Sequence, residues 1–227
     1  MTVLRTELTD AGEAAPAGMP AEHALLGLLA MRESGSGHGY ELARSFGPDA
    51  PLGSVIRLEP GMVYHHLKKL ERLGWVEVAP RGAPDRPARR PFALSAEGRQ
   101  ELLRWLAEPV AHTREIRLEF LVKLYLALQL EPALAMRLID EQRAMCSHLI
   151  ESLSEQRGED SRSRGDDSSG VRFGEMVLDM RLAQTEAALA WLDRVRREAA
   201  AVGFADTGNE NPGTSTVSNS MRDENRG

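Results

Sequence analysis

The apolar positions in the first seventy residues recur at helical spacing in three successive segments. Because residues three and four apart lie on the same side of a helix, these repeats predict three helices. The first runs from Pro20 to about Glu33, the second covers about 38–46, and the third begins near Pro60. Glycine, serine and proline separate the segments, as is typical of turns. We therefore expect three short helices joined by loops.

The third helix has two chemically different sides. Val63, Leu67 and Leu70 share one side, because successive helical residues are offset by about 100°. The opposite side gathers small and basic residues, namely Gly61, His65, Lys68, Lys69 and Arg72. Such a helix can pack on the first two through its apolar side and leave the basic side for a partner.

A period of two replaces the helical period after the third helix. Residues 75–79 and 91–94 predict two strands of a hairpin. The connection between them contains three prolines and four arginines, the latter being Arg81, Arg86, Arg89 and Arg90. Ser95 is a good N-cap for a following helix that reaches about Glu108.

The second half of the chain is helical in pattern from Glu115 onward, with a restart at Pro132. The segment 154–170 has no hydrophobic residue and predicts a flexible, solvated loop, before a last helix that spans about 171–200. Long amphipathic helices beside a small domain are often paired across a two-fold axis, so we expect a homodimer. The candidate dimerisation residues are Leu118, Leu121, Tyr125, Leu149, Leu178, Leu182, Leu189 and Trp191.

The predicted fold is mainly α with a small β-hairpin. Three helices followed by a hairpin with a basic tip is the order of a winged helix-turn-helix, which we place at 20–109. A C-terminal helical dimerisation domain follows at 110–203. The segment 1–19 is rich in Ala, Gly, Pro and Thr, and the chain is polar from Asp206 onward, so we expect disordered tails at 1–19 and 204–227.

Charge is distributed unevenly along the 227 residues. The whole chain carries a net charge of −6. The stretch from Arg57 to Arg99 nevertheless holds nine basic and five acidic residues, a net charge of +4, which leaves −10 for the remainder. A protein that concentrates positive charge locally can bind a polyanion there, so the acidic total does not exclude nucleic acid.

Composition narrows the class of protein further. The chain has one cysteine, Cys146, and no disulfide framework, and its longest apolar runs are shorter than the ~18 residues of a membrane span. No secretory signal is evident near Met1, so we expect a cytoplasmic protein. Cys146 has apolar helical neighbours and is expected to be a core residue.

Catalytic and metal-binding motifs are missing from the sequence. We find no P-loop, no nucleophile with a paired base and no acidic pair suited to a cleft, so we expect no enzyme and no cofactor. His65 and His66 are neighbours, but adjacent helical residues point about 100° apart and do not readily share one ion. We therefore expect no metal site.

Three stretches resemble the PadR family of transcriptional regulators. They are Gly39–Leu42, Pro60–Glu71 and Phe92–Gly98, and Leu118–Tyr125 resembles the start of the C-terminal domain in the virulence-activator branch of that family. The resemblance implies a winged-helix dimer, usually a repressor, that binds DNA with Tyr64 among its contacts. The chain departs from the family pattern in having His65 where a proline is common.

The third helix and the hairpin together fit double-stranded DNA. A major groove admits one α-helix, and an arginine-rich loop can reach the adjacent backbone or minor groove. The candidate DNA-binding residues are Tyr40, Gly61, Met62, Tyr64, His65, Lys68, Lys69, Arg72, Arg81, Arg86, Arg89 and Arg90. As a dimer, the protein is expected to bind a near-palindromic operator, and the sequence leaves open whether a small-molecule effector regulates it.

Two other interpretations compete with a DNA-binding repressor. The basic side of the third helix could be an ordinary solvated surface, or the winged helix could be an adaptor that binds another protein and no duplex. The arginine-rich connection favours DNA over both. Trp105 and Trp191 are expected to be core or interface residues.

Overall fold

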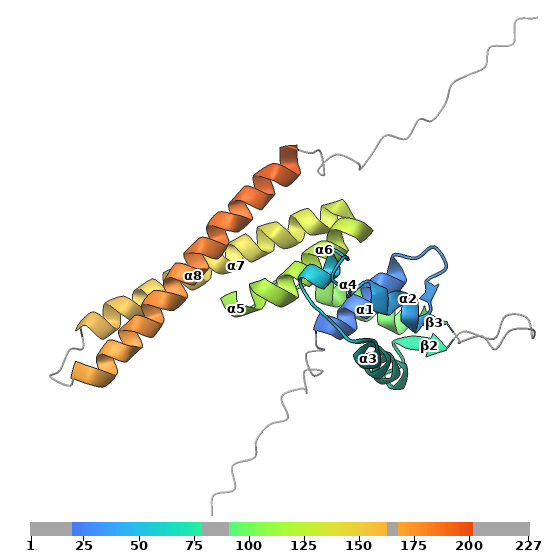
Figure 1. Ribbon diagram of the computed structural model, residues 1–227. Coiled ribbons are helices and arrows are strands. Elements are labelled where there is room, and N and C mark those ends of the chain that lie inside the picture. The colour runs from blue at the N-terminus through green and yellow to red at the C-terminus, as the bar shows by residue number, and fades with distance from the viewer. Residues whose placement is uncertain (1–19, 79–90, 163–167, 202–227) are drawn as a thin grey trace, which may run out of the picture.

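The computed structural model describes residues 20–78, 91–162 and 168–201. Its elements, labelled in Figure 1, follow one another along the chain. They are α1 (Pro20–Ala30), β1 (Ser36–Gly37), α2 (Gly39–Arg44), η1 (Leu52–Ser54), α3 (Pro60–Arg72), β2 (Val76–Val78), β3 (Phe92–Leu94), α4 (Ala96–Ala107), α5 (Thr113–Glu115), the π-helical turn η2 (Ile116–Phe120), α6 (Leu121–Leu130), α7 (Pro132–Arg162) and α8 (Ser168–Ala201). The predicted mainly helical fold with a small hairpin is confirmed.

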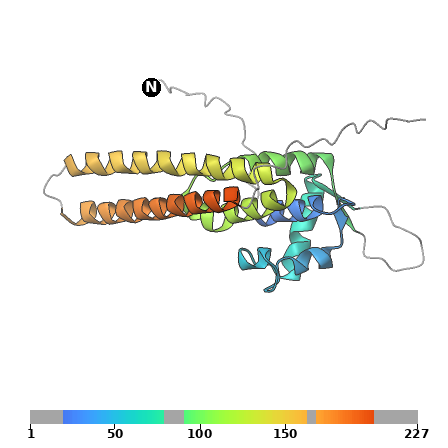
Figure 2. The same cartoon turned by 90° about the horizontal axis from the view of Figure 1, so that it is seen from above.

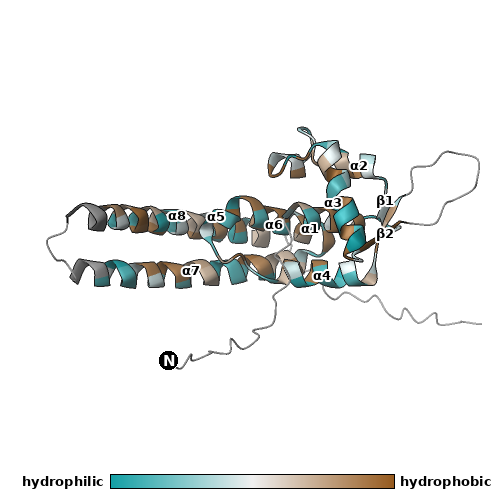
Figure 3. Ribbon diagram, turned by 90° about the horizontal axis from the view of Figure 1, so that it is seen from below, coloured by the Kyte–Doolittle hydropathy of each residue, from teal (hydrophilic) through white to brown (hydrophobic). Residues whose placement is uncertain are grey.

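Helices α1 to α4 and a small sheet form one end of the molecule, and the α7–α8 pair extends from the other side (Figure 1). Figure 2 shows that α7 and α8 run side by side in opposite directions. In Figure 3, hydrophilic and hydrophobic residues alternate along both helices, as expected when one side is packed and the other is exposed.

The sheet has three strands in the order β1–β3–β2, all antiparallel. The predicted hairpin is present, with Val76 opposite Leu94 and Val78 opposite Phe92. The added strand β1 pairs Ser36 with Ala93. The sequence predicted the end of the first helix there but not a strand, because two small residues give no alternating pattern.

The first turn of α4 is fixed by the predicted cap. The Ser95 hydroxyl accepts a hydrogen bond from the Gly98 amide at 2.9 Å and donates one to the Gly74 carbonyl oxygen at 2.7 Å. Gly74 has a positive φ of 73°, a conformation that favours glycine. Gly98 lies so close to the carbonyl of Trp75 that a Cβ would overlap it. These contacts join the end of α3 to α4.

Helix α1 contacts both halves of the molecule, and a single buried apolar cluster extends from α3 through α1 to α6 and α7. Gly27 permits a close approach between helices, because a Cβ at this position would overlap the side chain of Leu126 in α6. Gln142 of α7 adds a buried hydrogen-bond pair with the backbone of Val110, at 2.7 and 3.0 Å. The helical half is therefore packed directly on the winged-helix half.

The predicted flexible loop over 154–170 is wrong in extent. Helix α7 continues to Arg162 and α8 begins at Ser168. The segment lacks apolar residues but contains glutamate, glutamine and arginine, which are good helix formers. The packing of α7 against α8 supports the added turns, as the ion pair between Arg157 and Asp179 at 3.2 Å illustrates.

Candidate nucleic-acid interface

Helix α3 has the two sides that its sequence predicts. Val63, Leu67 and Leu70 are fully buried in the core. Pro60 occupies the first turn, where its missing amide hydrogen costs nothing. His66 is also buried, which the sequence did not indicate.

The opposite side of α3 is open to solvent. His65, Lys68 and Arg72 are exposed, and they follow one another at spacings of three and four residues. Gly61 is exposed at the start of the helix, and a Cβ there would meet no described atom within 4 Å. A partner can therefore approach the backbone closely at the first turn and meet positive charge along the rest of the helix.

Lys69 differs from its neighbour Lys68. Its Nζ donates a hydrogen bond of 2.6 Å to Oε1 of Glu22 in α1, and its side chain is only 39% exposed. Nδ1 of His66 lies 3.3 Å from the same oxygen. The positive charge of Lys69 is thus compensated within the protein, which changes its expected role as a DNA contact.

Three large side chains border the exposed side of α3. Tyr40 in α2 and Met62 in α3 are exposed, and Tyr64 is half-buried against Gly39. A Cβ at Gly39 would overlap the Tyr64 ring, so glycine is needed for this contact. The structure therefore brings Tyr40, Met62 and Tyr64 to the same region as the basic residues.

The strands β2 and β3 hold the two ends of the predicted wing beside α4. The four arginines of its tip, Arg81, Arg86, Arg89 and Arg90, lie outside the described residues. Their role stays a prediction from the sequence.

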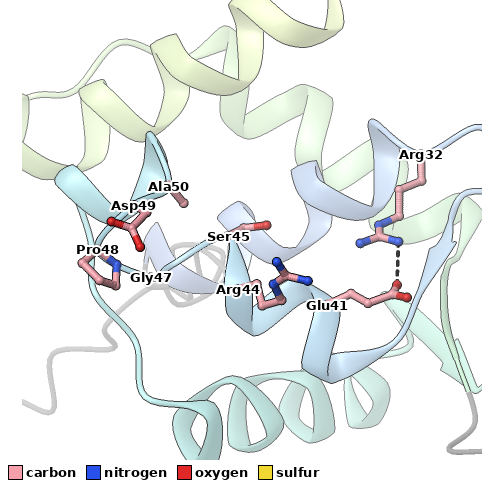
Figure 4. Close-up of a pocket in the computed structure, with 8 residues that line it drawn as sticks. All are labelled: Arg32, Glu41, Arg44, Ser45, Gly47, Pro48, Asp49 and Ala50. Carbon is pink, nitrogen blue, oxygen red and sulfur yellow. Dashed lines mark hydrogen bonds and ion pairs between the residues drawn. The ribbon is translucent and has the colours of Figure 1, made fainter.

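An open groove of about 630 Å³ lies between the end of α1 and the loop that follows α2 (Figure 4). Its lining includes two arginines, Arg32 and Arg44, and two carboxylates, Glu41 and Asp49. Arg32 donates to Glu41 at 2.8 Å, and Glu41 caps α2 through the His38 amide at 3.4 Å. The pKa of Glu41 is lowered, first by this backbone hydrogen bond and then by Arg32. The groove is balanced in charge and has no feature that would select an anion.

Known proteins match both halves of the chain. Residues 25–104 match the family model described as the transcriptional regulator PadR-like family, and residues 116–199 match virulence activator alpha C-term. A probable transcriptional regulator of Mycobacterium tuberculosis is 31% identical over 186 residues, which cover 78% of this chain and 96% of that protein. The chain belongs to the PadR-like family of transcriptional regulators. The resemblance expected from the sequence is confirmed, and so is the expectation that the protein is not an enzyme.

Two solved structures of low sequence identity are similar to this PadR-like chain. Bacillus subtilis PadR in complex with operator DNA is 23% identical, with a TM-score of 0.36, and the match covers 78% of this chain and 98% of that one. The virulence activator AphA of Vibrio cholerae is 22% identical, with a TM-score of 0.33, and the match covers 80% and 99%.

A buried polar cluster joins the two halves of the regulator. The ring of His23 in α1 is stacked on Trp105 of α4, with centroids 4.4 Å apart, and Nε2 lies 2.9 Å from Oε1 of Glu101. Trp105 donates from Nε1 to Glu119 at 3.0 Å. Lys123 of α6 pairs with the same carboxylate at 3.2 Å and lies 4.7 Å from the Trp105 ring centroid. Trp105 is therefore a core residue between α1, α4 and α6.

Burial dominates the ionisation of the two basic groups of this cluster, His23 and Lys123. It lowers the pKa of His23, although Glu101 opposes the effect. Burial also lowers the pKa of Lys123, against the attraction of Glu119. For Glu101, burial would raise the pKa, but hydrogen bonds from Arg104 and His23 outweigh it and leave the pKa lowered. The folded protein therefore favours a neutral His23.

The candidate dimerisation residues fall into different environments. Leu118 is exposed, and Leu121, Tyr125, Leu149, Leu182, Leu189 and Trp191 are half-buried. Leu178 is buried within the chain itself. The leucine stripe chosen from the sequence therefore includes much of the side of α8 that packs on α7.

A second row of residues on α8, apart from Trp191, was not predicted from the sequence. Spacings of four and three residues relate Phe173, Val177, Met180, Gln184, Ala187 and Trp191. Phe173 and Met180 of this row are 69% and 54% exposed, and Met176, which lies beside the row, is 63% exposed. The row borders an open groove of about 720 Å³ between α8 and the α5–η2 segment. Alternating spacings of four and three were visible in the sequence, but the leucines of the packed side gave a stronger signal.

Other candidate sites find little support in the structure. No group of three or more histidine, cysteine or acidic side chains that could hold a metal ion occurs within the described ranges. Cys146 is buried, and burial raises the pKa of its thiol, which disfavours the reactive thiolate. In the part of the chain that the structure covers, no helix is long and apolar enough to cross a membrane.

Proposed function

We propose that this PadR-like regulator binds double-stranded DNA as a homodimer and represses transcription from a near-palindromic operator. The observation that carries the proposal is the exposed side of α3, where His65, Lys68 and Arg72 follow an unobstructed first turn. Their positions on a helix whose opposite side is fully buried suit insertion into the major groove.

The surroundings of α3 support duplex binding rather than a generic charged surface. Tyr40 and Met62 are large exposed side chains next to the basic residues, where they can contact sugar or base surfaces. The strands β2 and β3, between which the arginine-rich segment lies in the sequence, belong to the same half of the molecule. Positive charge from two separate segments can thus meet one phosphate backbone.

A homodimer is supported by the second row on α8. Three exposed apolar side chains lie within eight residues, Phe173, Met176 and Met180, and exposed apolar patches of this kind mark interaction sites. Two copies that meet through equivalent rows form a closed two-fold contact. Such a dimer presents two α3 helices to two half-sites about 34 Å apart or a multiple of this distance.

Salt dependence of duplex binding tests the DNA proposal. Fluorescence anisotropy with a labelled operator fragment measures affinity at several salt concentrations, the fragment being obtained by selection from a random duplex library. Changing Lys68, Arg89 and Arg90 together to alanine removes three phosphate contacts and is expected to flatten the slope of log affinity against log salt by about 2.7.

The control for this experiment is Arg137→Ala, which removes an exposed arginine of α7 that pairs with Glu131 at 3.7 Å. It is expected to leave the slope unchanged. A triple variant with the wild-type slope would contradict the assignment of the surface. A wild-type protein with no salt-sensitive duplex binding would favour the adaptor interpretation instead.

Light scattering coupled to size exclusion tests the dimer. We expect a dimer at micromolar concentration for the wild type and a monomer for Met176→Glu with Met180→Glu, since each change places a charge in the exposed apolar patch formed by Phe173, Met176 and Met180. Ala144→Glu alters an exposed position on α7 and serves as the matched control. A wild-type monomer would contradict the proposal.

A further inference from the structure

The two adjacent lysines of α3 are placed in different environments. Lys68 is exposed on the side that faces away from the core. Lys69, one residue later, directs its Nζ to Glu22 of α1 at 2.6 Å. A DNA phosphate could bind Lys68 without breaking any described ion pair, but it could bind Lys69 only in competition with Glu22.

Glu22 is an unusual residue for its position. It is 1% exposed, and its neighbours in α1 are also buried. Burying a carboxylate is costly unless ion pairs and hydrogen bonds compensate for the lost water. Oε1 receives both Lys69 and His66, while Oε2 is buried without a hydrogen-bond partner among the described residues. Although Glu22 lies in the first turn of α1, which favours a carboxylate, its described ion pairs and side-chain hydrogen bonds all come from α3.

The two α3 partners of Glu22 fix the helix in rotation. His66 and Lys69 are three residues apart and lie on the same side of α3. The apolar contacts of Val63, Leu67 and Leu70 are non-directional, so they tolerate a small roll of the helix. Two polar contacts to a single buried oxygen are directional, and a roll of α3 would lengthen them.

We propose that Glu22 is a positioning residue for DNA recognition, which sets the rotation of α3 and withholds Lys69 from the phosphate backbone. The proposal rests on the DNA binding proposed above. Lys68 then supplies the lysine contact to phosphate, and the fixed rotation keeps His65 and Arg72 in register with the groove. Release of Lys69 would add a phosphate contact that carries no sequence information.

Paired lysine variants test the proposal directly. Lys68→Met and Lys69→Met each remove one ammonium group from the same helix and retain most of the side-chain volume. We expect Lys68→Met to lower the salt slope of operator binding by about 0.9 and Lys69→Met to leave it unchanged. Equal reductions for the two variants would overturn the proposal, because Lys69 would then be a phosphate contact.

The isosteric variant Glu22→Gln tests the same restraint by changing the carboxylate instead of the lysine. Loss of the carboxylate charge frees Lys69, so the salt slope is expected to rise by about 0.9. The ratio of operator affinity to random-duplex affinity is expected to fall by several-fold. An unchanged slope and an unchanged ratio would each overturn the proposal, since a carboxylate with a merely structural role would move neither.

Melting temperatures show whether a variant has a folding defect that could be mistaken for a change in DNA binding. Lys69→Met is expected to lower the melting temperature more than Lys68→Met, and Glu22→Gln is expected to restore part of that loss in the double variant. Should Glu22→Gln fail to fold, the comparison of the lysine variants still decides the question. A wild-type protein without salt-sensitive binding would overturn the DNA proposal itself, whereas equal lysine effects would overturn only the role of Glu22.

Discussion

The α1–α3 contact and the α7–α8 contact both contain ion pairs, but the charged groups are buried to different extents in the two contacts. At the α1–α3 contact, the carboxylate of Glu22 is buried and is held by Lys69 and His66. At the α7–α8 contact, the charges form a partly exposed network, in which Asp140 pairs with Arg196 at 2.8 Å. A buried charge makes one helix orientation much more favourable than its neighbours, whereas an exposed network adjusts its side chains to small shifts. The helix proposed to read DNA has the stricter contact.

The first way to break this comparison is to remove one ion-pair partner from each contact. Lys69→Ala leaves the carboxylate of Glu22 buried without its lysine partner and is expected to lower the free energy of unfolding by about 3–5 kcal/mol. Asp140→Ala removes a partly exposed carboxylate and is expected to cost about 0–1 kcal/mol. Urea unfolding followed by circular dichroism measures both, and equal losses would contradict the distinction.

Substitutions at two glycines are expected to change the free energy of unfolding by an intermediate amount. Gly27→Ala forces a methyl group into the side chain of Leu126 and is expected to destabilise the fold by about 1–3 kcal/mol. At Gly158 of α7, an added methyl group would meet no described atom within 4 Å, so Gly158→Ala is expected to stabilise the helix by about 0.5–1 kcal/mol. Thermal unfolding of the two variants would show opposite signs, and a stabilising Gly27→Ala would contradict the close approach of α1 and α6.

The smallest expected effect is on the pH dependence of stability, and it arises from the buried side chain of His23. Burial lowers the pKa of His23 below 6.5, so the unfolded chain takes up a proton that the folded chain resists. The resulting stability is present above about pH 6.5 and is lost as the pH falls through the folded pKa.

Melting temperatures at pH 7.5 and 5.5 measure this loss. In His23→Phe the decrease is expected to be smaller than in the wild type, because the phenyl ring retains the stacking on Trp105 and has no proton to bind. His148 of α7 is exposed, and His148→Phe serves as the control with an unchanged decrease. The same decrease in all three proteins would contradict a buried, neutral His23.

The parts of the fold that follow from neighbours in the sequence were predictable. The apolar side of α3 depends on residues three and four apart, and the Ser95 cap depends on an amide three residues later. Both are local relations, which a sequence pattern expresses directly. The exposed positions of His65 and Lys68 follow from the same helical geometry.

The parts that depend on distant partners were not predictable. Glu22 and Lys69 are 47 residues apart, and His23 and Glu101 are 78 apart. Nothing near Glu22 in the sequence indicates that its carboxylate is buried, because a lone glutamate in an apolar helix is usually placed at the surface. Strand β1 was missed for the same reason, since it exists only through its pairing with β3. Which side of α8 is packed and which is exposed depends on its contact with α7, so the sequence of α8 alone did not distinguish them.

The position of α1 between α3 and α6 has a consequence for the length of the operator. Since α1 packs on both, with Gly27 allowing α6 to approach closely, one continuous packed core joins α3 to the α7–α8 pair. In the proposed dimer, the angle at which two α8 rows cross would then set the separation of the two α3 helices. Half-site spacing across related regulators would accordingly vary with side-chain volume at positions such as Phe173 and Met180, far from any base pair.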